Sequence, residues 1–240
     1  MRLLAVALAA LALPATLAAG SPVTVFGAAS LTNVLPRIDK GSRYSFAGSD
    51  QLALQIRQGA PADVYAAASP KHTQLLYRDG LVLKPVVFAT SKLVVLVPRS
   101  NPGAVRTVYD LRREGLKIVI GDRTVPIGAY TRQILDALGI ANEVLKNVVS
   151  QEADVKGIVA KVALGEADAG FVYVTDAKPV AARTRIVALP GWAQPPIRYE
   201  IAVVKASSHR AAAAAFVRKV LSKRGRLLLA RGGFGLPKKR

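Results

Sequence analysis

The sequence predicts an α/β protein of two domains, each a mixed, mostly parallel sheet flanked by helices, with two hinge strands joining the domains. Short apolar runs alternate with helical patterns from residue 23 to about residue 89, and a second block from residue 117 to 174 repeats this alternation. Such alternation is typical of parallel sheets. Strong strand patterns at Lys92–Val97 and Tyr199–Val204 flank the second block, so we expect the chain to leave one domain and return to it.

The predicted domains follow from those two crossings. Domain I comprises residues 21–90 and 202–240, and domain II comprises residues 91–201. A ligand is expected in the cleft between them, where the ends of strands from both domains converge. Closure of the cleft about the hinge strands would bury that ligand.

The individual elements are read from hydrophobic periodicity and from breaker residues. The predicted strands are 23–26, 43–47, 64–68, 92–97, 117–122, 147–150, 169–174 and 199–204. The predicted helices are about 31–38, 51–58, 69–79, 108–113, 125–138, 151–164, 208–222 and 225–231. Residues 232–235, Gly-Gly-Phe-Gly, are interpreted as a frayed helix end.

The first twenty residues have the pattern of a secretory signal peptide. Arg2 precedes an almost unbroken apolar run, and small residues at 18–21 offer a cleavage site. The chain has no cysteine, so it has neither a disulfide nor the cysteine that a bacterial lipid anchor requires. We therefore expect a soluble protein in the periplasm or a similar extracytoplasmic space.

The chain is strongly basic, with 34 Lys and Arg against 15 Asp and Glu and a formal net charge of +19. A balance of this kind raises the question of nucleic acid. The basic residues are scattered and no aromatic-studded basic motif is present, so we expect no nucleic-acid partner. The densest basic cluster is the tail from residue 219 to 240, which is interpreted as a solvated terminal helix.

Two short turns are the strongest local signals for a binding site. Ser30 and Ser49 each follow an apolar strand pattern and small residues, and each precedes a helical pattern. The first N–H groups of a helix lack intrahelical partners and point toward anions. Two such turns that face each other would bind a small oxyanion, whereas the alternative is that each serine simply caps its helix.

Enzymatic activity is not expected. The only histidines, His72 and His209, lie near no nucleophile motif and are interpreted as surface groups. The sequence has no zinc-ligand spacing, no GxGxxG motif and no P-loop. A secreted hydrolase on the same scaffold stays as the alternative from another class.

Several acidic residues are given structural roles. Asp154 and Glu152 are interpreted as acids that favour the dipole of the following helix, and Asp63 and Asp176 are expected to fix loops.

Six segments together resemble one family, the periplasmic molybdate-binding proteins of ABC importers, a branch of the type II periplasmic solute-binding proteins. The resemblance covers nearly all of the chain after the signal peptide. The segments are Val25–Asn33, Ser45–Ser49, Gln58–Val64, Gly121–Tyr130, Glu152–Gly157 and Gly170–Ala177.

The resemblance implies a type II binding-protein fold and a tetrahedral dianion held by neutral donors. These donors are the hydroxyls of Ser30 and Ser49, the backbone N–H groups of Ser30, Ser49, Ile127 and Val155, and the phenol of Tyr173. The implied ligand is molybdate or tungstate, and the alternative is sulfate or another oxyanion. A cavity lined only by donors would reject phosphate, because its proton would find no acceptor. The resemblance further implies an ABC importer as partner, a monomeric protein and no cofactor.

The sequence departs from the family pattern near both lobes of the expected site. Ile127 stands where the family commonly has Ala, which keeps the backbone donor but adds a larger side chain. Asp50 follows Ser49 where a third hydroxyl is common, so its carboxylate must point away from an anion or cap its helix. The link from Ser30 to Ser49 is also short, which predicts a curtailed first helix.

Overall fold

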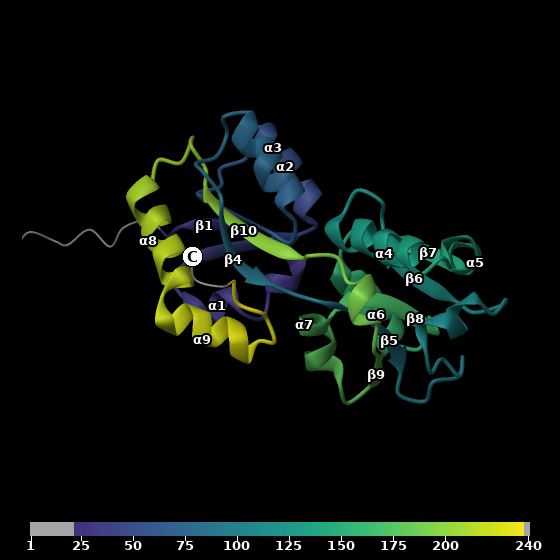
Figure 1. The fold of residues 1–240 in the computed structure, drawn as a ribbon. Helices are drawn as coiled ribbons and strands as arrows, with labels where there is room; N and C mark the ends of the chain where they lie inside the picture. Colours follow the sequence, from purple (N-terminus) through teal and green to yellow (C-terminus); the bar gives the residue numbers. More distant parts are fainter. Residues whose placement is uncertain (1–21, 238–240) are drawn as a thin grey trace, which may run out of the picture.

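The computed structural model describes residues 22–237. Within this range the chain folds into two lobes, each built around its own five-stranded sheet (Figure 1). The predicted signal peptide and residues 238–240 of the basic tail lie outside the described residues. None of the helices within residues 22–237 is long and apolar enough to cross a membrane.

The first lobe contains the sheet with strand order β2-β1-β3-β10-β4. Strand β1 is parallel to β2 and β3, whereas β10 is antiparallel to β3 and β4, so β10 alone runs in the opposite direction. The strands are β1 Thr24–Ala28, β2 Arg43–Ala47, β3 Val64–Ala67, β4 Val86–Thr90 and β10 Arg198–Val203. The helices are η1 Ala29–Leu31, α1 Leu35–Ile38, α2 Ser49–Arg57, α3 Pro70–Arg78, α8 Arg210–Leu221 and α9 Lys223–Arg231.

The second lobe repeats this plan with strand order β7-β6-β8-β5-β9. Strand β6 is parallel to β7 and β8, and β5 is antiparallel to β8 and β9. The strands are β5 Leu93–Pro98, β6 Ile118–Gly121, β7 Val148–Glu152, β8 Ala169–Tyr173 and β9 Thr184–Val187. The helices are η2 Val108–Arg112, α4 Pro126–Ala137, α5 Ala141–Lys146, α6 Val155–Ala163, α7 Val174–Ala177, η3 Lys178–Val180 and η4 Gly191–Ala193.

The predicted fold class is confirmed. Each sheet has four strands in one direction and one reversed strand, which is the mixed, mostly parallel arrangement expected from the sequence. The reversed strands are those at which the chain changes lobe: it enters the second lobe at β5 and returns to the first at β10. Figure 1 shows extended segments running between the lobes at these two places. The exact domain limits stay a prediction.

Helices cover both faces of each sheet, which explains why the central strands are apolar throughout. In the first lobe α2 and α3 lie on one face, and α1, α8 and α9 lie on the other (Figure 1). All residues of β3, β5 and β8 are buried. Parallel strands buried on both faces have continuous apolar sequences, and this pattern was the basis of the strand predictions.

Two edge strands were not predicted. Strand β4 pairs only with β10, and β9 pairs only with β5. Strand β4 is apolar but only partly buried, whereas β9 lacks the sustained apolar pattern of a central strand. In β9 the two middle residues, Arg185 and Ile186, are both exposed.

The interpretation of residues 232–235 as a frayed helix end is wrong. Helix α9 ends at Arg231, and the chain then turns back so that Gly235 and Thr90 exchange backbone hydrogen bonds of 2.8 and 2.9 Å. Phe234 is 5% exposed and packs against Tyr199 with ring centroids 5.3 Å apart. This burial holds the end of the described chain against β4 and β10.

The interpretation of His72 as a surface group is also wrong. His72 lies on the face of α3 that packs against the sheet, together with Thr73 and Leu76, and it is 7% exposed. Burial lowers the pKa of its imidazole, because the charged form loses hydration, although the Asp50 carboxylate opposes this shift. The side chain therefore favours the neutral form.

Asp63 and Asp176 both hold chain segments together, although Asp176 lies in a helix. Asp63 accepts hydrogen bonds from the backbone N–H of Thr24 at 2.7 Å and from the Ser207 hydroxyl at 2.6 Å. Asp176, in α7, accepts from Lys156 Nζ of α6 at 2.5 Å. Each carboxylate thus joins elements that are distant in the sequence.

Candidate functional site

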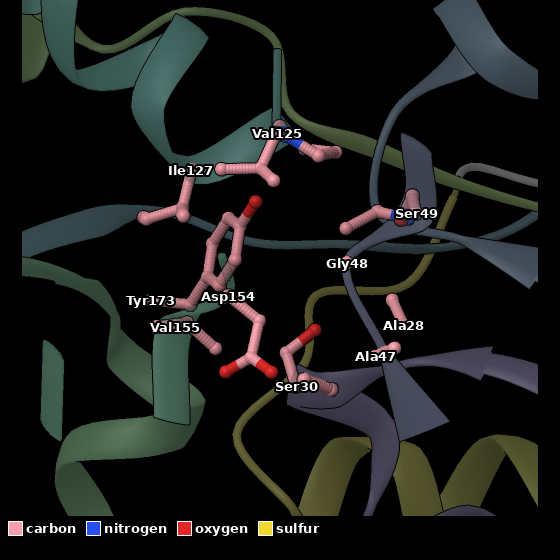
Figure 2. Close-up of a pocket in the computed structure, with 13 residues that line it drawn as sticks. Ala28, Ser30, Ala47, Gly48, Ser49, Val125, Ile127, Asp154, Val155 and Tyr173 are labelled. Atoms are coloured by element: carbon pink, nitrogen blue, oxygen red, sulfur yellow. The ribbon is translucent and has the colours of Figure 1, made fainter. Parts of the chain in front are cut away.

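Residues from both lobes surround one small cavity (Figure 2). All five predicted site residues line it: Ser30, Ser49, Ile127, Val155 and Tyr173. Its volume is about 20 Å³, slightly more than the roughly 10–15 Å³ that one water molecule needs. The cavity therefore suits a small ion in this arrangement of the lobes. Contact of these residues with an anion stays a prediction.

Ser49 is held in a fixed orientation at the start of α2. The phenol of Tyr65 donates to the Ser49 carbonyl oxygen at 2.6 Å, and the Ala68 N–H donates to Ser49 Oγ at 3.1 Å. Because Oγ accepts this hydrogen bond, its own hydrogen is available to donate into the cavity. The N-cap of α2 is Gly48, and the N-cap makes no side-chain hydrogen bond.

Ser30 lies within η1 and contacts β10, the strand by which the chain returns to the first lobe. Its hydroxyl is 2.9 Å from the phenol oxygen of Tyr199 in β10. When Tyr199 donates, the Ser30 hydrogen is free to face the cavity. The N-cap of η1 is Ala28, so neither Ser30 nor Ser49 is an N-cap, and the simple capping interpretation is wrong for both. The first helix, α1, is only four residues long, as the short Ser30–Ser49 link predicts.

Tyr173 lies at the end of β8 and carries the clearest sign of an unmet interaction. The residue is 2% exposed, and its hydroxyl has no hydrogen-bond partner within the described structure. A buried hydroxyl without a partner costs free energy. Burial raises the pKa of the phenol well above 10.0, so it remains a donor at neutral pH. In Figure 2 its oxygen points toward the turn at Val125 and Ile127.

The starts of two helices of the second lobe complete the cavity. The α4 N-cap, Val125, makes no side-chain hydrogen bond, so the orphan N–H groups of the first turn, including that of Ile127, lack a side-chain cap. In α6, Asp154 Oδ1 accepts from the N–H groups of Lys156 and Gly157 but not from that of Val155. The N–H groups of Ile127 and Val155 are therefore not taken by side-chain caps, and their contact with an anion stays a prediction.

The cavity is not lined only by donors, which corrects the expectation from the sequence. The Asp154 carboxylate is part of the lining, and Figure 2 shows it directed toward the side of the cavity that holds Ser30. It is the only charged side chain among the described lining residues, since no Lys or Arg contributes. Asp154 does serve its helix as an acidic cap, as predicted, but the start of that helix faces the site.

Asp50 points away from the cavity and bridges the lobes. The hydroxyl of Thr124, in the turn before α4, donates to Asp50 Oδ2 at 2.6 Å. Asp50 is not among the residues that line the cavity. The carboxylate that replaces a hydroxyl at this position thus contributes to the contact between lobes.

The closeness of the lobes is clearest at Gly48. A Cβ atom at this position would lie 2.6 Å from the Ala153 carbonyl oxygen and 3.1 Å from Val125 Cγ1, both in the second lobe. Real Cβ atoms essentially never approach other atoms as closely as 2.6 Å. The structure is therefore a closed arrangement that only glycine permits here.

Two features of the site were not predicted from the sequence: the contact between Tyr199 and Ser30, and the Asp154 carboxylate in the cavity lining. Tyr199 is separated from Ser30 by 169 residues, and no local signal connects them. Asp154 had a detectable signal, because an N-cap side chain lies beside the same N–H groups that were expected to bind the anion.

Within residues 22–237 there is no group of three or more His, Cys, Asp or Glu side chains arranged to hold a metal ion.

The comparisons with known proteins identify the family of the chain. The sequence model of the family described as bacterial extracellular solute-binding protein matches residues 39–235. The chain belongs to this family. The molybdate-binding protein ModA of Mycobacterium tuberculosis is 39% identical to this chain over 225 residues. The match covers 90% of this chain and 85% of the relative.

Solved structures share the fold of the solute-binding protein. The periplasmic molybdate-binding protein of Azotobacter vinelandii has a TM-score of 0.80 at 23% identity, with 90% of this chain and 100% of that chain covered. The sulfate-binding protein SubI of M. tuberculosis has a TM-score of 0.76 at 19% identity, with 89% and 86% covered. At these identities the structures support the two-lobed fold alone.

Proposed function

We propose that this solute-binding protein is an extracytoplasmic receptor that captures molybdate or tungstate and delivers it to an ABC importer. One observation carries the proposal: the buried hydroxyl of Tyr173, which has no partner within the described residues, faces a cavity of about 20 Å³ that two serine hydroxyls and the starts of α4 and α6 also face. Relatives that are molybdate-binding proteins, at up to 39% identity, support this choice of anion.

The donors are sufficient in number for tight binding. Hydrogen bonds to a charged group contribute about 1.5–3 kcal/mol each. Association costs about 4–15 kcal/mol in lost freedom of motion. When the association cost is in the lower half of that range, charge-assisted bonds from Ser30, Ser49, Ile127, Val155 and Tyr173 exceed it and reach the roughly 8 kcal/mol of micromolar affinity. No cationic side chain is required in the cavity.

The remaining features of the proposal concern the working form of the protein. It acts without a cofactor and without enzymatic activity, as a monomer in the periplasm or an equivalent space, after removal of residues 1–20. Its partners are the oxyanion and the membrane subunits of the importer. Anion binding stabilises the closed arrangement, and opening at the importer releases the anion.

Anion titration of residues 21–240 tests the proposal. We expect molybdate and tungstate to stabilise the protein saturably, by about 2.7 kcal/mol when the free anion is a hundredfold above its Kd. Calorimetric titrations with sulfate and phosphate should give much weaker binding. Preferential binding of sulfate would assign the protein to the alternative oxyanion class, and stabilisation by none of the four anions would contradict a receptor role.

Serine variants test the assigned site. We expect Ser30→Ala and Ser49→Ala each to weaken binding at least about tenfold, which corresponds to ~1.4 kcal/mol. Ser208→Ala is the matched control, because Ser208 is exposed and lies outside the cavity lining. Parental affinity in the double variant Ser30→Ala/Ser49→Ala would refute the site.

A further inference from the structure

A second, basic hollow adjoins the candidate site. Its volume is about 270 Å³, and its lining includes the side chains of Arg37, Lys178 and Arg231. Arg37 comes from α1, Arg231 from the end of α9, and Lys178 from η3 of the second lobe. We refer to this feature as the basic hollow. It therefore lies across the boundary between the lobes.

The three cations of the basic hollow are free to act on a passing anion. All three residues are exposed, and none forms an ion pair with a residue of the described range 22–237. No carboxylate is among the described residues that line the hollow.

Carboxylates on the neighbouring elements are already neutralised. Asp39, which follows α1, pairs with Lys219 at 2.8 Å. Asp176 of α7 pairs with Lys156 at 2.5 Å and is buried. The Asp154 carboxylate, on the Ser30 side of the adjoining cavity, has no ion-pair partner within residues 22–237, and the three positive charges of the hollow outnumber it.

The basic hollow and the candidate site share a wall. Ser30 lines both, so its two sides face the two spaces. Phe234 lines the hollow and packs against Tyr199, whose phenol contacts Ser30 at 2.9 Å. On the far side of the hollow, Lys178 Nζ donates to the Arg231 carbonyl oxygen at 2.9 Å, which joins the two lobes there. Separation of the lobes would break this contact and open space beside Ser30.

We infer that the basic hollow is the entrance that draws oxyanions to the site, with Arg37, Lys178 and Arg231 setting the association rate. This inference rests on the proposed function. None of the three cations lines the cavity where the anion is held, so their attraction acts during approach. Clefts lined by charge of one sign raise on-rates by about 10- to 1000-fold, and this effect falls steeply with ionic strength. The screening length falls from about 30 Å at 0.01 M salt to about 8 Å at 0.15 M.

Stopped-flow measurement of molybdate association tests the inference. We expect the variant Arg37→Gln/Lys178→Gln/Arg231→Gln to associate about three- to tenfold more slowly than the parent at low salt, with the difference shrinking as salt is raised. The dissociation rate should change little. The matched control is Lys84→Gln/Lys117→Gln/Lys146→Gln, which removes the same charge from exposed residues outside both spaces.

The outcomes separate this inference from the proposed function. Equilibrium titration of the parent comes first, and absence of binding to molybdate and tungstate would overturn both. If the parent binds, equal association rates in the hollow variant and the parent would overturn the entrance alone. An equal slowing in the control variant would also overturn it, because the effect would then come from net charge. The single variant Arg37→Gln, which removes no ion pair, provides the same test with a smaller expected slowing if the triple variant is unstable.

Discussion

At the scale of single residues, Tyr173 has opposite effects on stability and on binding. Its hydroxyl is buried without a partner in the described structure, which costs about 1–3 kcal/mol. We expect Tyr173→Phe to leave the free energy of unfolding unchanged or higher without anion, and to weaken molybdate binding at least about tenfold. Chemical denaturation and calorimetric titration measure the two quantities separately.

Tyr65 is the matched control for this tyrosine. It is also buried, but its hydroxyl donates to the Ser49 carbonyl oxygen at 2.6 Å. Tyr65→Phe should therefore lower the free energy of unfolding by about 1 kcal/mol, because a buried carbonyl loses its partner. A loss of stability in Tyr173→Phe equal to that in Tyr65→Phe would show that Tyr173 has a structural partner and is no dedicated ligand group.

The sequence could predict the site residues that lie at strand ends and helix starts. Ser30 and Ser49 were found because small residues and a hydroxyl at such turns have a physical reason to face an anion. Tyr199 was not found, since its contact with Ser30 depends on how the chain returns to the first sheet. The burial of His72 was missed because one polar residue on a helix does not reveal which face packs inward.

At the scale of elements, the start of α6 combines a cap with an unfavourable charge. Asp154 accepts from the N–H groups of Lys156 and Gly157, yet its carboxylate lines the cavity. Asn caps helices about as well as Asp, whereas Ala at an N-cap costs about 1 kcal/mol. We expect Asp154→Asn to retain stability and to bind molybdate at least about threefold more tightly, because like-charge repulsion is removed.

The Ala variant separates the two roles of Asp154. Asp154→Ala should lose about 1 kcal/mol of stability through the missing cap. Thermal unfolding without anion and calorimetry with molybdate give the two readouts. Weaker anion binding by Asp154→Asn than by the parent would contradict a repulsive role and would indicate that the carboxylate orients a donor.

An ion pair between α1 and α8 makes stability depend on pH. Burial raises the pKa of the Asp39 carboxyl, but the Lys219 side chain and the Gly41 N–H outweigh it, so the pKa lies below 3.8. The unfolded chain then binds more protons near pH 3.8, and this contribution is present above 3.8 and lost as the pH falls through the folded-state pKa. Asp39→Asn should be less stable than the parent at neutral pH, by at most about 1 kcal/mol because Lys219 is exposed.

Urea unfolding at several pH values measures this contribution. The difference between Asp39→Asn and the parent should shrink as the pH is lowered below 3.8. Arg57 and Asp79 form a surface pair at 2.8 Å, so Asp79→Asn is a control on the opposite face of the sheet. A difference for Asp39→Asn that stays constant with pH would contradict the electrostatic origin.

The central strands and the edge strands β2 and β7 were predictable from sequence, whereas the edge strands β4 and β9 were not. Leu93–Pro98 and Ala169–Tyr173 are buried on both faces and give uninterrupted apolar runs. Strand β9 buries only part of its length and contains Arg185. Its existence depends on the pairing with β5, which lies about ninety residues earlier in the chain. Periodicity within a short window cannot report such a pairing.

At the scale of the whole molecule, the hinge could be predicted but the contacts that close it could not. The two crossings follow from the strand patterns, whereas the bond between Asp50 and Thr124 joins side chains 74 residues apart. The same contact shows how this chain accommodates an acidic residue beside Ser49. Closure depends on a close fit between surfaces, and only the folded structure places those surfaces together.

Gly48 provides the sharpest test of closure. A Cβ here would meet the Ala153 carbonyl oxygen at 2.6 Å across the lobes, and the backbone φ of −56° allows alanine without strain. We expect Gly48→Ala to weaken molybdate binding at least about tenfold. Its stability without anion should change by at most about 1 kcal/mol, because the one close contact within its own lobe, Asp50 Oδ1 at 2.7 Å, is the end of a side chain that can shift.

Small-angle scattering with and without molybdate shows whether the lobes close. The parent should contract on binding, and Gly48→Ala should contract less at an anion concentration that saturates the parent. Gly191→Ala is the control, because a Cβ there has no other atom within 4 Å, so it should bind and contract as the parent does. Full contraction of Gly48→Ala with parental affinity would mean that the lobes close on the anion without this approach of the Gly48 turn to Ala153.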